Sequence, residues 1–342
     1  NIIMTMTTKS MSMTSTAPAA ATITIITMTM TDMVTAITAK KVRKERVKMA
    51  NAINAAPKTK RKKESMWAQV FRRLLKNPSA TIGLAVIALL ILLSILAPYI
   101  TKYTYEEMDL LALNATPSWE HPFGTDSLGR DCLSRLLYGG RFSLGLGIIS
   151  AVTSTAVAIV LGSIAGYFGG WVDNLIMRIC DVLQSIPGML LSIIISATLG
   201  VGFVNTVIAL SVGGIAGGIR MLRGQILGIR KEEYLEAAMT VNCSPARIMF
   251  RHILPNALSA TIVGVTMGMG NTIMVAASLS YIGLGVQPPD PEWGAMLSSG
   301  RDVFRKYPHI MLFPGVFIFI TVLCFNLFGD GLRDAMDPKL KR

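Results

Sequence analysis

The sequence is poor in charge. Only 15% of its 342 residues are Asp, Glu, Lys or Arg. These residues make up about a quarter of ordinary soluble domains. Hydrophobic residues reach 51%, and the mean hydropathy is +0.51. Because a soluble globular domain does not carry this balance, the composition indicates an integral membrane protein.

Cysteine and histidine are scarce and lie far apart. No two cysteines form a Cys-x-x-Cys pair, so neither a disulfide framework nor a zinc site with closely spaced ligands is expected. A metal cluster could arise only if folding brought distant residues together, and we predict no metal site. The residues concerned are Cys132, Cys180, Cys243, Cys324, His121, His252 and His309.

Two kinds of functional residue are missing. No Gly-x-x-x-x-Gly-Lys-Ser/Thr loop occurs, so we expect neither ATP binding through such a loop nor an enzyme. The long apolar runs contain no Asp, Glu, Lys or Arg at their centres. An ion-coupled secondary transporter or a channel usually needs ionisable groups or a selectivity constriction there. That class stays open as an alternative, as does a membrane scaffold without transport.

Positive charge is concentrated before the first long apolar run. The formal net charge is +13, and most of the excess lies between Lys40 and Lys76. Basic residues beside a span favour the cytoplasmic side, so residues 40–78 are expected to be a basic cytoplasmic segment. Within it, Met66 to Leu75 has the pattern of an amphipathic helix on the membrane surface. The scarcity of aromatic residues in this segment argues against nucleic-acid binding.

Residues 1–39 have an unusual composition. They mix Thr, Met, Ala and Ile with little charge, and the chain begins with Asn1. Threonines interrupt the solid apolar run that a signal peptide requires. We therefore expect a low-complexity, disordered extension or a misassigned start.

Five long uncharged runs predict six membrane helices, because roughly 20 residues cross a bilayer and one of the runs is long enough for two spans. The third and fourth share one run between Asp181 and Arg220, which is too long for one span and is divided at Gly200-Val201-Gly202. Pro187 is expected to kink or open the third helix. Basic residues place both termini in the cytoplasm. The predicted spans are 79–96, 144–167, 182–198, 204–218, 257–281 and 310–328.

A charged segment, residues 230–255, lies between the fourth and fifth predicted spans. Good helix formers over Glu232–Val241 predict one helix, and Asn242 is expected to end it because Asn tolerates the left-handed conformation. Ser244 and Pro245 suit the N-cap and first position of a second helix. Leu254-Pro255 is expected to end that second helix.

This segment resembles the coupling loop, or EAA loop, of binding-protein-dependent ABC importer permeases. It departs from the family in one place, where Asn replaces Gly. In that family the loop lies in a groove of the ATPase subunit, and small alanines let a partner backbone approach closely. An ordinary helix-turn-helix between two spans is the alternative. The residues of this predicted coupling site are Glu236, Ala237, Ala238, Asn242, Ile253, Leu254 and Pro255.

Three further segments are similar to dipeptide, oligopeptide and nickel ABC permeases of the second-subunit type. His121–Leu144 contains Phe-Gly-Thr-Asp, Gly-Arg-Asp and Gly-x-Arg-x-Ser-Leu in that order. Gly283–Gly294 contains Gly-Leu-Gly, paired prolines and Trp-Gly, and its Trp293 is expected at the membrane interface. Gly329–Pro338 matches the end of the family's sequences. The resemblance covers roughly residues 66–340.

Charged residues before the second predicted span are expected to pair at the outer membrane boundary. Two acids there can neutralise three arginines. The cluster is interpreted either as a contact for a substrate-binding protein that shapes the outer mouth, or as a self-contained set of ion pairs that fixes a helix end. These residues are Asp126, Arg130, Asp131, Arg135 and Arg141.

The fifth predicted span contains candidate residues for the translocation path, Asn271 and Ser278. A mid-membrane Asn is costly unless it faces protein or water. A hydrogen bond between helices is the alternative role for Asn271.

The resemblance implies an all-α integral membrane protein with the six-helix, type I ABC permease fold. It implies one of two permease subunits of an ATP-driven importer in the inner or plasma membrane. Its partners would be a second homologous permease, two ATPase subunits that hold ATP and Mg, an extracytoplasmic substrate-binding protein, and membrane lipids. No cofactor is expected in this chain. Di- or oligopeptides are the preferred substrates, and nickel is the alternative.

The expected organisation follows from these segments. It comprises the extension 1–39, the basic segment 40–78, the first span with its external loop 79–141, the permease core 142–333 with coupling loop 230–255, and the cytoplasmic tail 334–342.

Overall fold

The computed structural model describes residues 35, 38–48 and 66–336. The chain divides into two compact units, Asn1–Glu64 and Ser65–Arg342. In the first unit, residues 38–48 are helical. The predictions for the extension and the end of the tail therefore fall almost entirely outside the described residues.

The second unit is built from helices. Its described residues contain no strand beyond an isolated bridge between Thr125 and Asp131, which agrees with the predicted all-α class. The elements are α2 (Met66–Leu74), α3 (Pro78–Ile100), α4 (Cys132–Phe168), α5 (Gly170–Gln184), α6 (Gly188–Leu199), α7 (Phe203–Ile229), α8 (Glu233–Thr240), α9 (Pro245–Arg247), a π-helix (Ile248–Ile253), α10 (Leu254–Tyr281), α11 (Trp293–Gly300), a 3-10 helix (Arg301–Val303) and α12 (His309–Met336).

Five helical stretches of the described chain are long and apolar enough to cross a membrane. They are α3, α4, α7, the continuous stretch Pro245–Tyr281, and α12. The pair α5 and α6 makes a sixth only if it counts as one span, because the two helices meet at 83°. Several helices run past their predicted ends, since charged residues continue the helix beyond the apolar run: α7 extends to Ile229 and α12 to Met336.

The predicted third span, residues 182–198, is not one helix, and the disruption expected at Pro187 is a complete break. The first residues of that stretch belong to α5, and the helix breaks before Pro187, whose backbone is extended at φ −52° and ψ 132°. Proline has no N–H to continue the helical ladder and disfavours helical geometry in the residue before it. α6, with 12 residues, is too short to cross alone.

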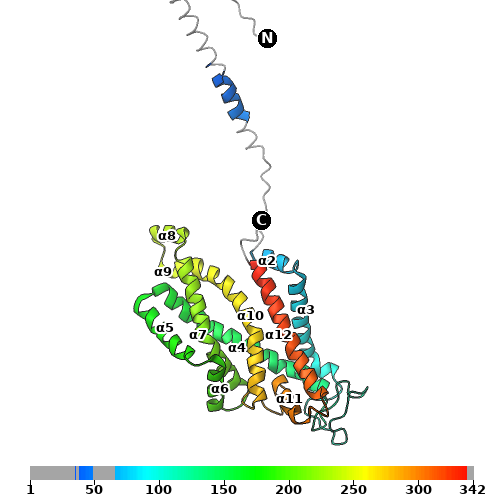
Figure 1. Ribbon diagram of the computed structural model, residues 1–342. Coiled ribbons are helices and arrows are strands. Elements are labelled where there is room, and N and C mark those ends of the chain that lie inside the picture. The colour runs from blue at the N-terminus through cyan, green and yellow to red at the C-terminus, as the bar shows by residue number, and fades with distance from the viewer. Residues whose placement is uncertain (1–34, 36–37, 49–65, 337–342) are drawn as a thin grey trace, which may run out of the picture. The chain divides into compact units, whose positions relative to one another are not determined.

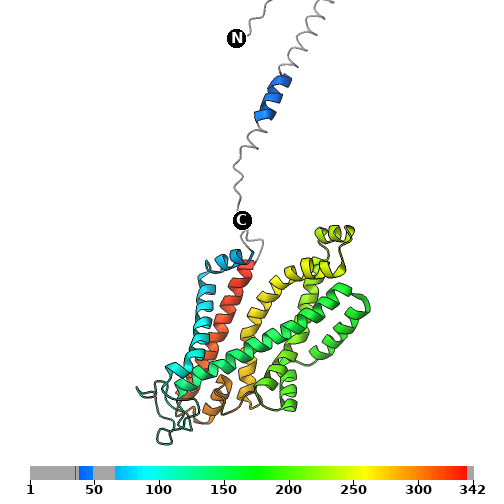
Figure 2. The same cartoon turned by 180° about the vertical axis from the view of Figure 1, so that it is seen from behind.

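The helices of the second unit form two arms that share one end (Figures 1 and 2). α3 and α12 run side by side, and α2 lies across their ends on the side where α8 and α9 project. α11 and the loop between α3 and α4 lie at the opposite end. The core where the arms meet includes Leu136, Ile273, Trp293 and Phe325, all buried.

Close helix packing depends on particular glycines of α4. A Cβ added at Gly147 would lie 2.2 Å from Ile273 Cγ1, and one added at Gly162 would lie 3.0 Å from the Ile219 carbonyl oxygen. Neither approach leaves room for a side chain. These glycines therefore bring α4 against α10 and α7.

Candidate functional site

The segment between α7 and α10 forms a helix-turn-helix, as predicted. α8 ends in a left-handed residue, Asn242, with φ +58°, and the Cys243 N–H donates to the Ala238 carbonyl at 3.1 Å across the turn. Ser244 then caps α9 by accepting from the Arg247 N–H at 3.4 Å, with Pro245 in the first helical turn. The local sequence therefore determines a sharp reversal of the chain here.

One side of α8 is fixed to the rest of the molecule. Leu235 is 1% exposed and packs with Leu222 and Ile226 of α7 and with Ile253 of the π-helix. The other side of α8 is open: Glu236, Ala237 and Asn242 are exposed and Ala238 is half-buried. Among the residues that the structure describes, the Glu236 carboxylate has no ion-pair partner. This surface is accessible and presents small side chains beside one carboxylate, while the opposite side of the helix is buried.

The prediction that Leu254-Pro255 ends the second helix is wrong. The π-helix passes directly into α10, and the Leu254 N–H donates to the Met249 carbonyl, five residues back. Pro255 falls in the first turn of α10, where its missing N–H is least disruptive. Ile253 is buried, Leu254 half-buried and Pro255 exposed. The predicted coupling residues therefore fall into two groups. One lies in the exposed turn after α8, and the other lies where the π-helix continues into α10.

Arginines near this segment tie α7 to α4 and α5. Arg230 Nη1 donates to the carbonyls of Gly166 at 3.2 Å and Tyr167 at 3.0 Å, at the end of α4. Arg223 pairs through two nitrogens with Asp173 of α5. The partners of these arginines lie 50 or more residues away in the chain, so no local sequence pattern reveals them.

Arg178 and Asp181 lie one helical turn apart on α5, with 3.9 Å between Arg178 Nη1 and Asp181 Oδ2. Asp181 is held more closely by Arg220 of α7, which the sequence did not predict. The α5 helix is thus joined to α7 at two places.

The loop between α3 and α4 is predicted to lie on the external side, and we call it the outer cap. Its buried charges pair differently from the prediction. Asp126 pairs with Arg130 at 2.7 Å and lies 3.6 Å from the Arg135 Nε. Among the described residues, Asp131 forms no ion pair with an arginine. It caps α4 by accepting from the Ser134 N–H at 2.7 Å and lies 3.0 Å from His121 Nδ1. All of these side chains are less than a tenth exposed.

Within the described part of the chain Arg141 pairs with no acid, and the prediction that Asp126 or Asp131 neutralises it is wrong. Pro98 lies inside α3 and has no N–H, so the Ser94 carbonyl four residues earlier lacks its helical donor. Arg141 Nε donates to this carbonyl at 2.8 Å, and its Nη2 donates to the Ile95 carbonyl at 2.9 Å. The arginine therefore compensates for a proline in a neighbouring helix.

A buried carboxylate, which the sequence reasoning missed, holds α11 against α4. Glu292 Oε1 accepts from Ser143 Oγ at 3.0 Å, and Oε2 accepts from the Ala295 N–H at 2.9 Å. Burial raises the pKa of Glu292 above its usual value. It occupies the N-cap position of α11, where Glu is not a preferred residue, so no local signal marked it.

Trp293 was predicted to lie at a membrane interface, and this prediction is wrong. It is 1% exposed, and its Nε1 donates to the Leu136 carbonyl at 3.0 Å. It anchors α11 in the core.

The two polar candidates on α10 share one side of the helix, because they are seven positions apart. Asn271 is exposed and, within the described residues, makes no hydrogen bond to another helix. Ser278 is half-buried, and its hydroxyl donates to the Met274 carbonyl of its own helix. The alternative role of Asn271 as a link between helices is therefore not realised within the described chain.

Apolar spans, a bent helix pair and a helix-turn-helix at one end together define a multi-span membrane permease. Residues 158–342 match the family described as binding-protein-dependent transport system inner membrane component. Residues 65–117 match the N-terminal transmembrane domain of oligopeptide transport permease C. The chain belongs to this family of inner membrane permeases of binding-protein-dependent transporters.

Similar proteins support the same assignment. A glutathione transport system permease protein, GsiD, of Pectobacterium atrosepticum is 45% identical over 276 residues, which cover 80% of this chain and 92% of that protein. A dipeptide transport system permease protein, DppC, of Alkalihalophilus pseudofirmus is 43% identical over 277 residues, covering 81% and 91%. A chain of the MetNI methionine ABC transporter superposes with a TM-score of 0.50 at 20% identity, covering 59% of this chain and 97% of that one. The predicted family and type I permease fold are thereby confirmed.

Proposed function

We propose that this chain is one of two permease subunits of an ATP-driven importer for short peptides. Relatives with more than 40% identity that match nearly full-length are named for glutathione or dipeptide transport, which favours a peptide over nickel. The ATP and Mg would be held by two separate ATPase subunits, and this chain would catalyse no reaction. An extracytoplasmic binding protein would deliver the peptide, and both termini would face the cytoplasm.

The observation that carries the coupling proposal is the exposed turn on a rigid base. Glu236, Ala237 and Asn242 are accessible, whereas Leu235 fixes the same helix to α7 and to the π-helix. A partner that grips the turn would move α7 and α10 together instead of bending a loop. Closure of the ATPase subunits would in this way be converted into alternating access between the spans.

The remaining candidate residues support parts of this mechanism. Asn271 and Ser278 are proposed to face the translocation path, because they lie on one side of α10. For the outer cap, the near-complete burial of Asp126, Arg130 and Arg135 favours a structural cluster over a direct contact with a binding protein.

Glu236→Lys tests the coupling role. A cation in place of the exposed Glu236 should reduce the ATPase recovered with the permease at least about tenfold, since reversed charge at a docking surface costs several kcal/mol. Uptake of a labelled dipeptide should fall in parallel, while the amount of permease in the membrane stays unchanged.

Two variants serve as controls. Glu232→Lys changes an exposed residue that precedes α8, and it should leave ATPase recovery intact. Asn242→Gly keeps the left-handed turn and should behave as wild type. Unchanged ATPase binding with persisting uptake in the Glu236→Lys variant would refute the coupling role. Uptake driven by an ion gradient without ATP would refute the importer itself.

A further inference from the structure

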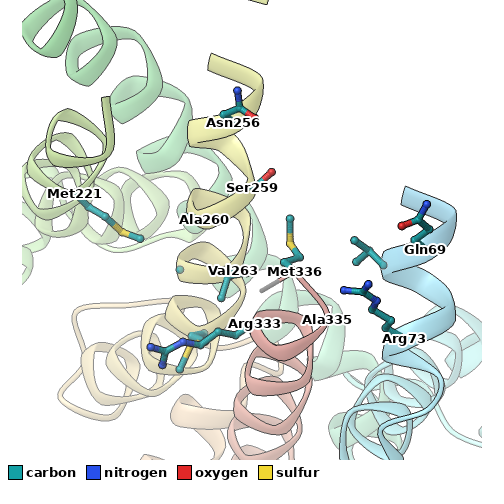
Figure 3. Close-up of a pocket in the computed structure, with 13 residues that line it drawn as sticks. Gln69, Arg73, Met221, Asn256, Ser259, Ala260, Val263, Arg333, Ala335 and Met336 are labelled. Atoms are coloured by element: carbon teal, nitrogen blue, oxygen red, sulfur yellow. The ribbon is translucent and has the colours of Figure 1, made fainter. Parts of the chain in front are cut away.

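A cavity of about 710 Å³ opens at the end of the second unit where α2 lies. Its walls come from α2, α7, α10 and α12 (Figure 3). None of the residues assigned above to coupling, to the translocation path or to the outer cap lines it. The cavity therefore calls for a separate explanation.

Most of the wall is apolar and adaptable. Val70, Val263 and Ala335 form buried parts of it. Met221 and Met336 add long, flexible side chains that can fit an irregular hydrocarbon surface. Such a wall suits a ligand with a hydrocarbon portion.

Two guanidinium groups, from Arg73 and Arg333, are the charged groups that line the cavity. Figure 3 shows them on either side of Met336, reaching from the α2 side and from α12. Among the described residues, no acid lines the cavity and neither arginine has a carboxylate partner. Asp330 and Asp334, the acids of α12 nearest to Arg333 in the described chain, are exposed outside the lining.

The two arginines lie beside the ends of apolar helices, where the headgroups of a bilayer are expected. Arg73 precedes Pro78, the first residue of the apolar helix α3, and Arg333 lies in the last turn of α12. Both positions mark the ends of predicted spans at the same side of the molecule (Figure 1). At this boundary, lipid phosphates are available to basic side chains.

We propose that the cavity binds one anionic phospholipid. Arg73 and Arg333 hold its phosphate and headgroup oxygens, because guanidinium matches phosphate in charge and geometry. The glycerol and the first part of the acyl chains lie on the apolar wall. This proposal depends on the membrane location of the chain and not on the solute it transports.

Other ligands match the chemistry of the cavity less well than a phospholipid does. A peptide would need partners for its amide groups, but Asn256 already donates to the Tyr234 hydroxyl and the His252 carbonyl. Ser259 likewise donates to the Pro255 carbonyl. A free phosphate ion would leave the apolar wall uncovered, and an apolar helix of a second subunit would leave both guanidiniums without a counter-charge.

Native mass spectrometry of the purified transporter complex tests the proposal. Complexes are incubated with phosphatidylglycerol or phosphatidylcholine, and the lipids retained are counted. The double variant Arg73→Gln and Arg333→Gln should retain less phosphatidylglycerol, by about fivefold for each guanidinium lost. Phosphatidylcholine should be retained equally by both proteins, and excess inorganic phosphate should not displace the bound lipid.

The matched control removes two exposed arginines at the opposite end of the molecule, Arg301→Gln with Arg305→Gln, and should retain the lipid as wild type does. A second variant, Gly264→Leu, narrows the cavity while keeping both arginines. A Cβ there would lie 2.8 Å from the terminal methyl of Met221, which can shift. This variant should assemble normally and lose the lipid.

Three results would overturn the proposal. The first is equal phosphatidylglycerol retention in wild type and the double arginine variant. The second is displacement of the lipid by inorganic phosphate. The third is complete cross-linking of a Ser259→Cys variant to the second permease subunit in a lipid-free complex, because protein would then fill the cavity.

Discussion

Asp126 is the residue on which the charges of the outer cap depend. Its carboxylate accepts from the Arg130 Nε at 2.7 Å and from the backbone N–H groups of Leu128 and Arg130. It also lies 3.6 Å from Arg135 Nε, and the three side chains are at most 4% exposed. Burying two guanidinium groups away from water is costly unless a carboxylate lies beside them.

Asp126→Asn should therefore destabilise the chain by about 3 to 5 kcal/mol, since it leaves buried charges uncompensated. Chemical unfolding in mixed micelles measures the loss. Glu120→Gln is the control, because Glu120 belongs to an exposed pair with Lys102 and its loss should change little. A variant Asp126→Asn as stable as wild type would show that the cluster contributes no net stability.

Single residues also show what sequence alone can reveal. Asn242 was predicted to take the left-handed conformation from local preferences, and it does. The partner of Arg141 was not predictable in the same way. It depends on a carbonyl that Pro98 frees in α3, and only the packing of α3 against α4 brings the two together.

At the scale of elements, the packing of α4 decides how the spans assemble. Gly147 faces Ile273 of α10, a residue only 1% exposed, so the contact has no free space for a larger side chain. Gly224 of α7 is different, because nothing lies within 4 Å of a Cβ added there.

Gly147→Leu should destabilise the chain by about 1 to 3 kcal/mol, because an overpacked interface must shift backbone or rotamers. Gly224→Ala should be neutral or stabilise by about 0.5 to 1 kcal/mol, since Ala is the better helix former. Unfolding midpoints of the two variants in the same detergent give the comparison. Equal effects would mean that α4 can slide away from α10.

Prolines explain where the predicted elements failed. Pro187 was recognised as a disruption, but the sequence did not indicate that the chain would turn by 83° there and leave α6 short. Pro255 was expected to end a helix and instead lies in the first turn of one. A proline's effect depends on which turn it occupies, and the π-helix before Pro255 changed that turn without a signal in the local sequence.

At the scale of the molecule, the proposed orientation has a direct consequence for cysteine chemistry. Cys132, Cys180 and Cys324 are buried and Cys243, in the turn after α8, is partly exposed. Trp119 of the outer cap is fully exposed, at 104% of its reference area. The two positions therefore report on opposite ends of the spans.

In cells without the ATPase subunits, a membrane-impermeant maleimide should label Trp119→Cys from outside. Wild type should be labelled at Cys243 only after the membrane is permeabilised. Mass spectrometry of the labelled peptides locates the modified cysteine. Labelling of Cys243 in intact cells would place the turn outside and invert the proposed topology.

The continuity of α10 with the π-helix has one more consequence. α10 has 28 residues, so it is a rod about 42 Å long. The core around Ile273 holds it about two-thirds of the way from the turn to the α11 end. If the rod tilts about this point, its two ends move in opposite directions, and under the proposed coupling role a displacement at one membrane face would then produce an opposite displacement at the other.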